Sequence, residues 1–267
     1  MRFVVCVKQV PDTTEVRIDP KTNTLVREGV ESILNPYDHF ALEEALRLKG
    51  SRDDIEVIVL SMGPPQARRV LQKSLALGAD RAYLLSDRVF AGSDTWATSV
   101  ALSHAVRKIG NADIVFCGLQ AIDGDTAQVG PEMAELLGLA QITYAEKLSL
   151  TYDGRLQVTQ QTEDGSRVLE SRMPVLVTCI PSPSFVPKVA PLPGIMEARR
   201  KPYEVLDHKA VKANEDDLGL AGSPTQVRRT YSPPARDDTR MLKGDTGEMT
   251  RQLAEILVER KIIGGDG

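Results

Sequence analysis

The loop of residues 118–131, GLQAIDGDTAQVGP, has the residue types and the spacing best suited to holding a ligand. It follows a short apolar run, and residues 132–137 after it have helical spacing. Its glycines permit tight turns and a close approach of the backbone to a ligand. With Asp125 or Thr126 as a helix N-cap, the free amides of the first helical turn could receive a diphosphate. An ordinary turn between a strand and a helix explains the same glycines equally well.

Two well-known phosphate motifs are absent from the chain. It contains neither GxxxxGK[ST] nor GxGxxG, which excludes a P-loop and the standard dinucleotide fingerprint. Asp123 and Asp125 would repel a phosphate, so we expect them to turn away, to cap amides or to bind sugar hydroxyls. No His or third carboxylate follows them at ligand spacing, and no metal site is expected.

Two other loops are expected at the same edge of a sheet. Residues 8–13 follow the first apolar run and carry Lys8, Asp12 and Thr13. The turn at 61–64, with Met62, follows the second run. Lys8 is either a phosphate partner or a solvated residue. Because the carboxyl ends of parallel strands meet at one edge, the three loops together predict a nucleotide pocket.

Nucleophilic catalysis finds little support in the sequence. The three histidines are scattered, and no Ser or Cys stands in a nucleophile elbow. Cys6, Cys117 and Cys179 lie far apart in apolar runs without a CxxC pair, so we interpret them as buried thiols. No catalytic residue is assigned.

The elements that position these loops follow from the hydrophobic periodicity. Short β-branched runs predict strands covered on both faces at residues 2–7, 55–60, 82–85 and 114–117. Apolar stripes with helical spacing lie between them at residues 41–48, 67–75 and 97–106. The alternation predicts an α/β fold with an open, mostly parallel twisted sheet and helices on both faces. Hairpin insertions are expected at residues 15–27 and 156–170.

The composition of the chain changes after the apolar run at 175–179. Prolines between residues 181 and 193 prevent a helix or strand from running through that stretch. The later residues are mostly polar, and one terminal amphipathic helix offers too little core to fold alone. We therefore expect a nucleotide-binding domain over 1–190 and, over 202–267, an extended C-terminal arm ending in a helix and laid on a partner chain. Wrapping of the arm back onto its own domain is the alternative.

Composition excludes other classes of function. Of the 267 residues 42% are hydrophobic and 26% charged, as in soluble globular proteins. The net charge of -4 leaves no global positive field to hold a nucleic acid. No run reaches the roughly 18 apolar residues of a membrane span, and the N-terminus lacks the features of a signal peptide. A cytoplasmic protein is expected.

Five segments occur in a characteristic order: VCVKQVPDT at 5–13, ILNPYDHFALEEALRLK at 33–49, LSMGPPQA at 60–67, ALGADRAYLL at 76–85 and GLQAIDGDTAQVGPE at 118–132. Together they resemble the beta subunit of electron transfer flavoproteins. The later LPGIMEARRK is similar to the end of the loop by which this family docks onto acyl-CoA dehydrogenase partners. The resemblance implies a partner-recognition loop over 181–201, in which Leu192 matches the anchoring leucine. A plain linker is the alternative.

The resemblance implies an adenine nucleotide hydrolase-like domain that works in a heterodimer. The alpha subunit would hold a mobile FAD, and the C-terminal arm of this chain would embrace that subunit. The nucleotide site of this chain would hold AMP as a structural ligand, as in some members, or a second FAD, as in electron-bifurcating members.

Positions carried over from the family give the residues of this cofactor site. Cys6 and Met62 would act mainly as walls. The others are Asn35, Gly118, Asp123, Gly124, Asp125, Thr126, Gln128 and Val129. AMP-carrying members typically have Asn before the Gln and Thr after it, where this chain has Ala127 and Val129. This departure favours FAD, as does the similarity of GDTAQVGP and of GSDTWAT at 92–98 to the bifurcating branch.

The resemblance implies two functions, of which the first is preferred. In the bifurcating one, the FAD of this chain accepts a hydride from NADH and passes one electron to ferredoxin or flavodoxin. The other electron goes through the alpha FAD to an acyl-CoA dehydrogenase-type flavoenzyme. Lys8, Asp12 and Thr13 are the nearest candidates for tuning the FAD of this chain. In the alternative, the chain binds AMP structurally in a one-FAD electron carrier. A stand-alone nucleotide-binding stress-type protein is a third interpretation, which the tail and the docking loop disfavour.

Overall fold

The computed structural model describes residues 1–12, 17–18, 25–26, 32–228 and 240–263. The chain divides into two compact units, Met1–Arg229 and Thr230–Gly267. The first unit holds a large sheet with its helices, and the second holds one helix. Thr13, one of the predicted site residues, lies outside the described residues.

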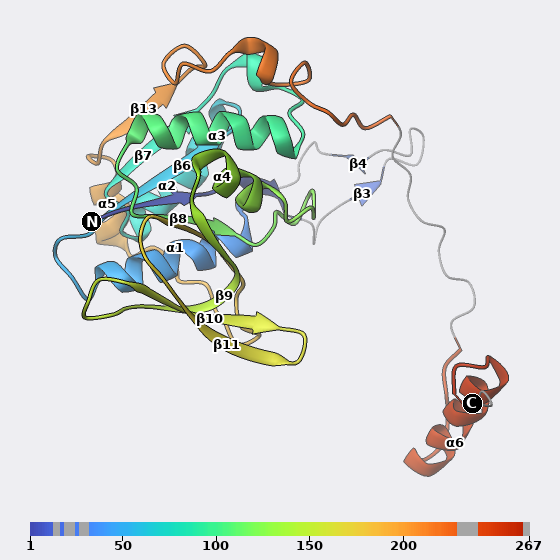
Figure 1. The fold of residues 1–267 in the computed structure, drawn as a ribbon. Helices are drawn as coiled ribbons and strands as arrows, with labels where there is room; N and C mark the ends of the chain where they lie inside the picture. The colour runs from blue at the N-terminus through green and yellow to red at the C-terminus, as the bar shows by residue number, and fades with distance from the viewer. Residues whose placement is uncertain (13–16, 19–24, 27–31, 229–239, 264–267) are drawn as a thin grey trace. The chain divides into compact units, whose positions relative to one another are not determined.

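Within the described residues, the first unit is built on one sheet of nine strands. They are β1 (Arg2–Cys6), β6 (Glu56–Met62), β7 (Arg81–Leu85), β8 (Ile114–Gly118), β9 (Ala140–Leu150), β10 (Leu156–Thr162), β11 (Gly165–Ser171), β12 (Val175–Cys179) and β13 (Tyr203–Leu206). Their order across the sheet is β11-β10-β9-β12-β8-β1-β6-β7-β13 (Figure 1). The strands from β9 to β13 in this order pair in parallel, and β10 and β11 extend the sheet as an antiparallel hairpin.

The middle of the sheet confirms the prediction from the apolar runs. Every residue of β12 is buried, as are all residues of β8 except the terminal Gly118. Strands covered on both faces need apolar side chains at successive positions, which is what these segments supply. β1 lies between β6 and β8, in the centre of the sheet. The α/β fold and the mostly parallel sheet are therefore confirmed.

Two short antiparallel pairs lie outside this sheet. One joins β2 (Gln9–Pro11) to β5 (Ser32–Leu34), and the other joins β3 (Arg17–Ile18) to β4 (Leu25–Val26). The second pair falls inside the hairpin predicted at 15–27, and the β10–β11 hairpin falls at the one predicted at 156–170.

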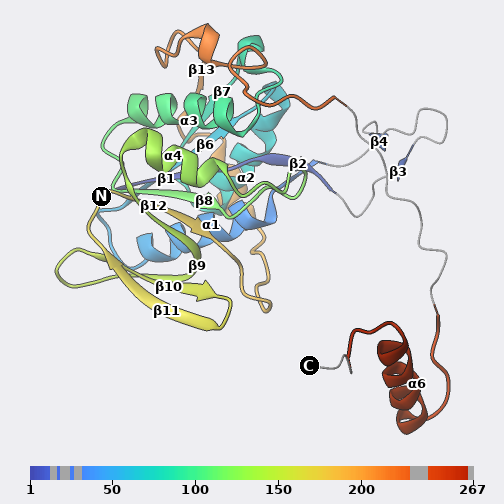
Figure 2. The same ribbon diagram turned by 45° about the vertical axis from the view of Figure 1, so that its right-hand side comes forward.

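Helices cover both faces of the sheet, as two views of the ribbon show (Figures 1 and 2). On one face α1 (Pro36–Lys49) and α2 (Arg68–Leu77) share a buried core with Phe3 and Val5. On the other face α3 (Thr95–Ile109) and α4 (Val129–Leu137) share a core with Val4. The alternation of β1 side chains between two apolar cores explains why this strand has no polar face. Short turns of 3-10 helix occur at η2 (Pro65–Ala67), η3 (Arg88–Phe90) and η4 (Glu215–Asp217).

The stretch expected to open the arm belongs in part to the main sheet. β13 pairs in parallel with β7 at the sheet edge, and Val211, Ala213 and Leu218 are buried in the core shared with α3. The compact unit accordingly runs to Arg229. A four-residue strand with exposed Glu204 and Val205 leaves no readable apolar period, so the sequence pattern does not indicate it.

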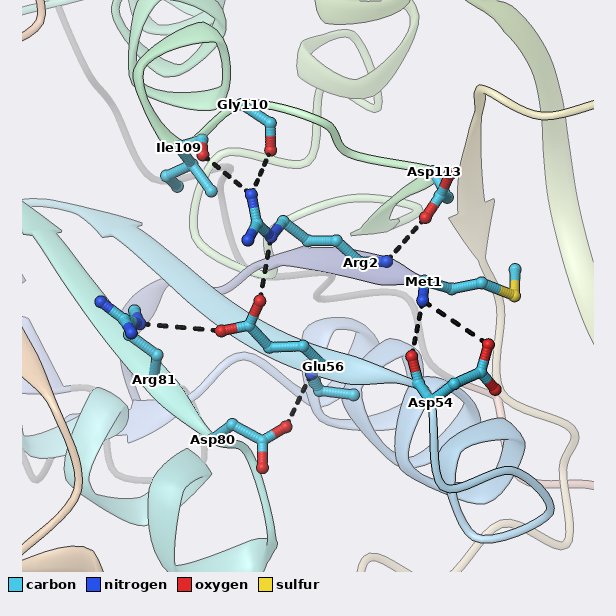
Figure 3. A network of polar contacts seen from close by, with 10 residues as sticks. Met1, Arg2, Asp54, Glu56, Asp80, Arg81, Ile109, Gly110 and Asp113 are labelled. Atoms are coloured by element: carbon cyan, nitrogen blue, oxygen red, sulfur yellow. Dashed lines mark hydrogen bonds and ion pairs between the residues drawn. The ribbon is translucent and has the colours of Figure 1, made fainter.

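A network of hydrogen bonds and ion pairs lies at the amino ends of the central strands (Figure 3). The Arg2 guanidinium lies 3.0 Å from Glu56 and donates to the carbonyls of Ile109 and Gly110, at the end of α3. The Arg2 backbone N–H donates to Asp113 across 2.7 Å. These contacts tie β1 to its neighbours at the edge opposite the carboxyl ends of the strands.

The second unit contains α6 (Thr246–Glu259), the predicted amphipathic helix. Asp245 caps its start in a capping box with Glu248, which satisfies two amides reciprocally. Leu253 and Val258 are exposed on it. Among the described residues, no helix combines the length and the apolar character that crossing a membrane requires.

Candidate functional site

A pocket of about 440 Å³ lies beyond the carboxyl ends of β1, β6 and β8. Because β1 stands between β6 and β8 while the chain proceeds from β1 to β6 first, the pocket is at a point where the winding of the sheet changes direction. Such crevices are the usual ligand sites of open α/β sheets. The pocket brings together Lys8, Met62 and the loop after β8, which are parts of the three loops expected at this edge.

The predicted site residues separate into two groups. Eight of them line the pocket: Cys6, Lys8, Met62, Gly118, Gly124, Thr126, Gln128 and Val129. Asp12, Asn35, Asp123 and Asp125 do not line it. Leu192 lies elsewhere, at the start of α5 (Leu192–Ala198), where its side chain is 71% exposed.

Asn35 supports the loop after β8. It is fully buried just before α1, and its side-chain amide donates to the Gln120 carbonyl across 2.9 Å. Its side-chain oxygen accepts the Ile122 N–H at 3.2 Å. With both polar groups used by this loop, Asn35 holds the pocket wall in place.

Lys8 and Asp123 form an ion pair with 2.7 Å between the ammonium and a carboxylate oxygen. The Lys8 side chain is about half exposed, so the pair stands at the mouth of the pocket. Asp125 instead accepts a hydrogen bond from the Gln120 side chain. Neither carboxylate lines the pocket, and each is paired with a residue that does, Asp123 with Lys8 and Asp125 with Gln120.

The start of α4 differs from the predicted cap. Its N-cap is Gln128 rather than Asp125 or Thr126, and no side chain caps the helix. Asp125 and Ala127 have positive φ angles of 52° and 53°, which non-glycine residues adopt only when their surroundings hold them there. This left-handed turn precedes the helix, and among the described residues no side chain caps the first amides of α4 at the pocket wall.

Gly130, in the first turn of α4, explains how closely the helix approaches the sheet. A Cβ at this position would lie 2.4 Å from Cγ2 of Thr178 on β12. At Gly124, by contrast, a Cβ would meet no atom within 4 Å. Gly130 is thus required by packing, whereas the space beside Gly124 is open to a ligand.

Asp38 is a site residue that the sequence does not indicate. It stands in the first turn of α1, lines the pocket and is 7% exposed. Its carboxylate accepts the backbone N–H groups of Lys8 and Gly118. Burial raises its pKa from 3.8 to about 7, although these hydrogen bonds act against the rise. An acidic residue in a first helical turn is common, so nothing in the sequence marks it.

A second unpredicted wall comes from residues 90–95, before and at the start of α3. Asp94 caps this helix by accepting the Ala97 N–H at 3.0 Å. Its other oxygen accepts both the backbone N–H and the hydroxyl of Thr225. Burial acts to raise the pKa of Asp94, but these hydrogen bonds outweigh it and lower the pKa. The stretch that follows β13 therefore fastens one wall of the pocket.

Cys6 and Cys117 form part of the pocket floor and are free, buried thiols. A hydrogen bond with Cys6, together with burial, raises the pKa of Cys117 well above its usual value. A protonated thiol is a weak nucleophile, so Cys117 contributes shape rather than reactivity. Cys6, which was expected to be a wall of the cofactor site, lines the pocket.

The pocket fits the phosphorylated end of a nucleotide. Uncapped amides at the start of α4 and a lysine, Lys8, in the lining of the same pocket suit an anion, while Leu60, Met62 and Leu102 supply apolar surface. Such a mixture of an apolar wall and a few polar groups is typical of small-molecule sites.

Comparison with known proteins gives the family. The model of the electron transfer flavoprotein domain matches residues 22–211. A subunit of the caffeyl-CoA reductase-Etf complex of Acetobacterium woodii, CarD, is 48% identical over 98% of this chain and 100% of its own length. The beta subunit of the electron transfer flavoprotein of Megasphaera elsdenii is 47% identical, with the same coverage of both chains. Protein FixA of Azorhizobium caulinodans is 47% identical over 96% of this chain and 94% of its own.

The family model matches more than half of the chain, and the first two relatives cover 98% of it, which includes the sheet, the pocket and the segment that bears Leu192. The chain therefore belongs to the electron transfer flavoprotein family, as a beta subunit.

Proposed function

We propose that the pocket binds the adenosine phosphate end of FAD. The observation that carries this proposal is the amino end of α4, which has no side-chain cap and lines the same pocket as Lys8. A volume of about 440 Å³ suits one nucleotide end, so the rest of a larger dinucleotide would extend beyond the pocket.

The choice of FAD over AMP is supported by the residues around Gln128. Ala127 and Val129 both line the pocket, and neither has a side-chain hydrogen-bond donor. The names of two relatives point in the same direction, since one is a subunit of a reductase-Etf complex and another is a FixA protein.

We propose that electrons enter from NADH and leave by two routes. One route leads to a low-potential acceptor such as ferredoxin or flavodoxin. The other leads, through a second FAD held mainly by an alpha subunit, to an acyl-CoA dehydrogenase-type flavoenzyme. A bound flavin would accept a hydride and then release its two electrons one at a time. The residues of this chain bind and orient the nucleotide and exclude water from its inner end.

The proposed docking surface for the dehydrogenase is the segment 181–201. Val186, Val189, Leu192 and Met196 are each more than 60% exposed. Large aliphatic side chains at this exposure bury apolar area only when a partner covers them. Leu192, at the start of α5, is the proposed anchor of the contact.

The segment is held at its base by α1. The Lys188 N–H donates to Glu43 across 2.7 Å, and the ring of Phe185 packs edge-on against Phe40, with 5.0 Å between centroids. A fixed base with exposed aliphatic side chains favours a docking loop over a linker.

The residues from 230 onward are the proposed arm to the alpha subunit. α6 has an amphipathic sequence, and an isolated helix of this length needs a partner surface for its apolar face to be stable. The alpha subunit is the proposed source of that surface.

The alternative function is an AMP-binding subunit of a one-FAD electron carrier. It is favoured by the pocket volume, which suits a mononucleotide without an extension. Both functions use the same adenosine phosphate site, so occupancy and activity must separate them.

An oxidation assay separates the two functions. The purified heterodimer with alpha is given NADH, ferredoxin and an acyl-CoA dehydrogenase with its enoyl-CoA substrate, and NADH loss is followed optically. Bifurcation predicts rapid NADH oxidation only when both acceptors are present. Equal rates with the dehydrogenase alone would contradict it and support the one-FAD carrier.

A further inference from the structure

Asp38 lies where two neighbouring strands of the sheet end. β8 finishes at Gly118, and Lys8 stands two residues beyond the end of β1. The pairing of β1 with β8 stops at Val5 and Phe116. The hydrogen bonds between these two strands therefore do not include Lys8 or Gly118. Their backbone N–H groups need another acceptor, because a buried N–H without one costs free energy.

The Asp38 carboxylate is that acceptor for both strands. One oxygen accepts the Lys8 N–H at 2.8 Å, and the other accepts the Gly118 N–H at 3.1 Å. The Lys8 carbonyl in turn accepts the N–H of Asn35, at 3.0 Å. Asp38 and Asn35 thus bind the backbone N–H and the carbonyl of Lys8, just beyond β1. Asp38 also binds the backbone N–H of Gly118, at the end of β8.

The packing at Gly118 leaves little freedom in this arrangement. A Cβ on Gly118 would lie 2.3 Å from the Asp38 carboxylate and 2.7 Å from Cβ of Tyr37. Only a glycine lets the turn of α1 sit directly on the strand end. The distance between the ends of β1 and β8, which form the pocket floor, therefore depends on the Asp38 side chain.

We propose that Asp38 is a positioning residue of the pocket, whose ionised carboxylate holds the ends of β1 and β8 at the spacing that the bound nucleotide requires. The nucleotide in this statement rests on the proposed function. Asp38 acts through the backbone of Lys8 and Gly118.

Protonation of Asp38 would weaken its hydrogen bonds to the backbone of Lys8 and Gly118. An ionised carboxylate accepts at both oxygens, whereas a protonated one turns one oxygen into a donor, which cannot accept equally from a backbone N–H. Burial raises the pKa of Asp38 to about 7, so its charge changes across neutral pH.

The charged and titratable groups around Asp38 come from three strands. Lys8, at the end of β1, favours the ionised form and is itself paired with Asp123. Cys117 on β8 and Cys179 on β12 have raised pKa values and stay protonated at neutral pH. Asn35, just before the same helical turn, also favours the ionised form. His39, the next residue in α1, has its pKa lowered from 6.5 by burial, whereas burial raises that of Asp38 to about 7.

The first test measures, without any nucleotide, whether the Asp38 carboxylate accepts the backbone N–H groups of Lys8 and Gly118. The full chain is labelled with 15N-lysine and 15N-glycine, and the amide resonances of Lys8 and Gly118 are followed between pH 5.5 and 8.5. We expect both to shift together with one midpoint, and to lose this shift in Asp38→Asn. Amides that do not titrate, or that titrate unchanged in the variant, would overturn the proposal.

The second test measures binding of FAD, whose diphosphate diester does not titrate near neutral pH. If only the ionised form of Asp38 makes the binding-competent pocket, wild-type affinity rises about tenfold from pH 6 to pH 8, in proportion to the competent fraction. Asp38→Asn should bind FAD weakly and with no pH slope. AMP serves as a second probe, read as the ratio of wild type to variant so that titration of its phosphate cancels.

The control is Glu44→Gln, which alters another buried carboxylate of α1. Glu44 accepts from Arg47 and from the Leu148 N–H, and it does not line the pocket. It should keep the wild-type affinity and pH slope. Thermal unfolding of each variant shows that it is folded, and Asp38→Ala provides a second removal of the carboxylate.

The outcomes distinguish this proposal from the proposed function. A variant Asp38→Asn that binds FAD or AMP as the wild type does, with the same slope, overturns the role of Asp38 and leaves the proposed function standing. A wild-type chain that binds neither nucleotide contradicts the proposed function, and the amide titration alone then decides whether Asp38 holds the strand ends.

Discussion

The Lys8 ammonium lies 2.7 Å from the Asp123 carboxylate, at the mouth of the pocket. The two residues follow β1 and β8, and their pair joins two loops that are 115 residues apart in the chain. Exposed ion pairs of this kind contribute about 0–1 kcal/mol to stability. If Lys8 binds a phosphate as proposed, the pair matters more for the ligand than for the fold, because Asp123 would compete with that phosphate for Lys8.

Removing the charge of Lys8 should lower nucleotide affinity, whereas removing the charge of Asp123 should raise it. Lys8→Met should weaken FAD binding by roughly 10- to 100-fold, since a charge-assisted hydrogen bond contributes on the order of 1.5–3 kcal/mol. Asp123→Asn should strengthen binding, because Lys8 is then free for the phosphate. Titration calorimetry on the full chain measures both. Parallel losses in the two variants would mean that the ion pair shapes the pocket and that Lys8 does not contact the phosphate.

Two glycines of the pocket loop should respond differently to a methyl group. Gly130→Ala brings a Cβ within 2.4 Å of Thr178 and should lower the free energy of unfolding by about 1–3 kcal/mol. Thr178→Ser removes the opposing methyl and should restore much of the loss. Gly124→Ala meets no protein atom and should leave stability unchanged. Urea unfolding of the four proteins checks this, and a destabilised Gly124→Ala would show that the open space is absent in solution.

His208 should make stability depend on pH. It lies 2.5 Å from Asp87 and 2.8 Å from Glu215, and its hydrogen bond to Asp87 raises its pKa above 6.5. A raised folded-state pKa gives stability that is full below pH 6.5 and is lost as pH rises through the folded value. The difference in melting temperature between wild type and His208→Gln should therefore shrink from about pH 6 towards about pH 9. A difference that stays constant with pH would show that His208 contributes through packing alone.

Leu192→Ala should slow electron transfer to the acyl-CoA dehydrogenase-type partner without changing the fold. The side chain is 71% exposed, so its loss removes little intramolecular packing. As the anchor of an interface, it should cost about 1–2 kcal/mol of binding, or roughly a tenfold rise in the KM for the partner. Tyr152→Ala, on an exposed turn of the β9–β10 hairpin, is the matched control. Equal KM values for Leu192→Ala and wild type would support a plain linker.

The fold was predictable where the chain is buried on both faces. β1, β6, β8 and β12 are continuous apolar runs, and this pattern predicts a strand or a strand-like segment in each. β9 gives no such signal, because only every third or so of its residues is buried and Tyr144 interrupts it with a positive φ of 55°. Half-exposed and irregular strands lack the periodicity from which a strand is predicted.

The site was predictable as a set of loops, but the roles of single residues were not. Lys8, Met62 and the loop after β8 converge as parallel strands require. Asn35 is expected from the family resemblance to be part of the cofactor site, yet its amide is used to hold the loop. Asp38 carries no signal at all, because its effect depends on β1 and β8 ending side by side, which is a tertiary fact.

The nucleotide content of the heterodimer tests the central claim most directly. The chain is co-expressed with its alpha partner, the complex is purified and denatured, and the released nucleotides are quantified by chromatography. Two FAD molecules per heterodimer and no AMP are the predicted result, and the Asp38→Asn complex should lose one of the two. One FAD with one AMP would contradict the bifurcating assignment and make this chain a structural nucleotide-binding subunit.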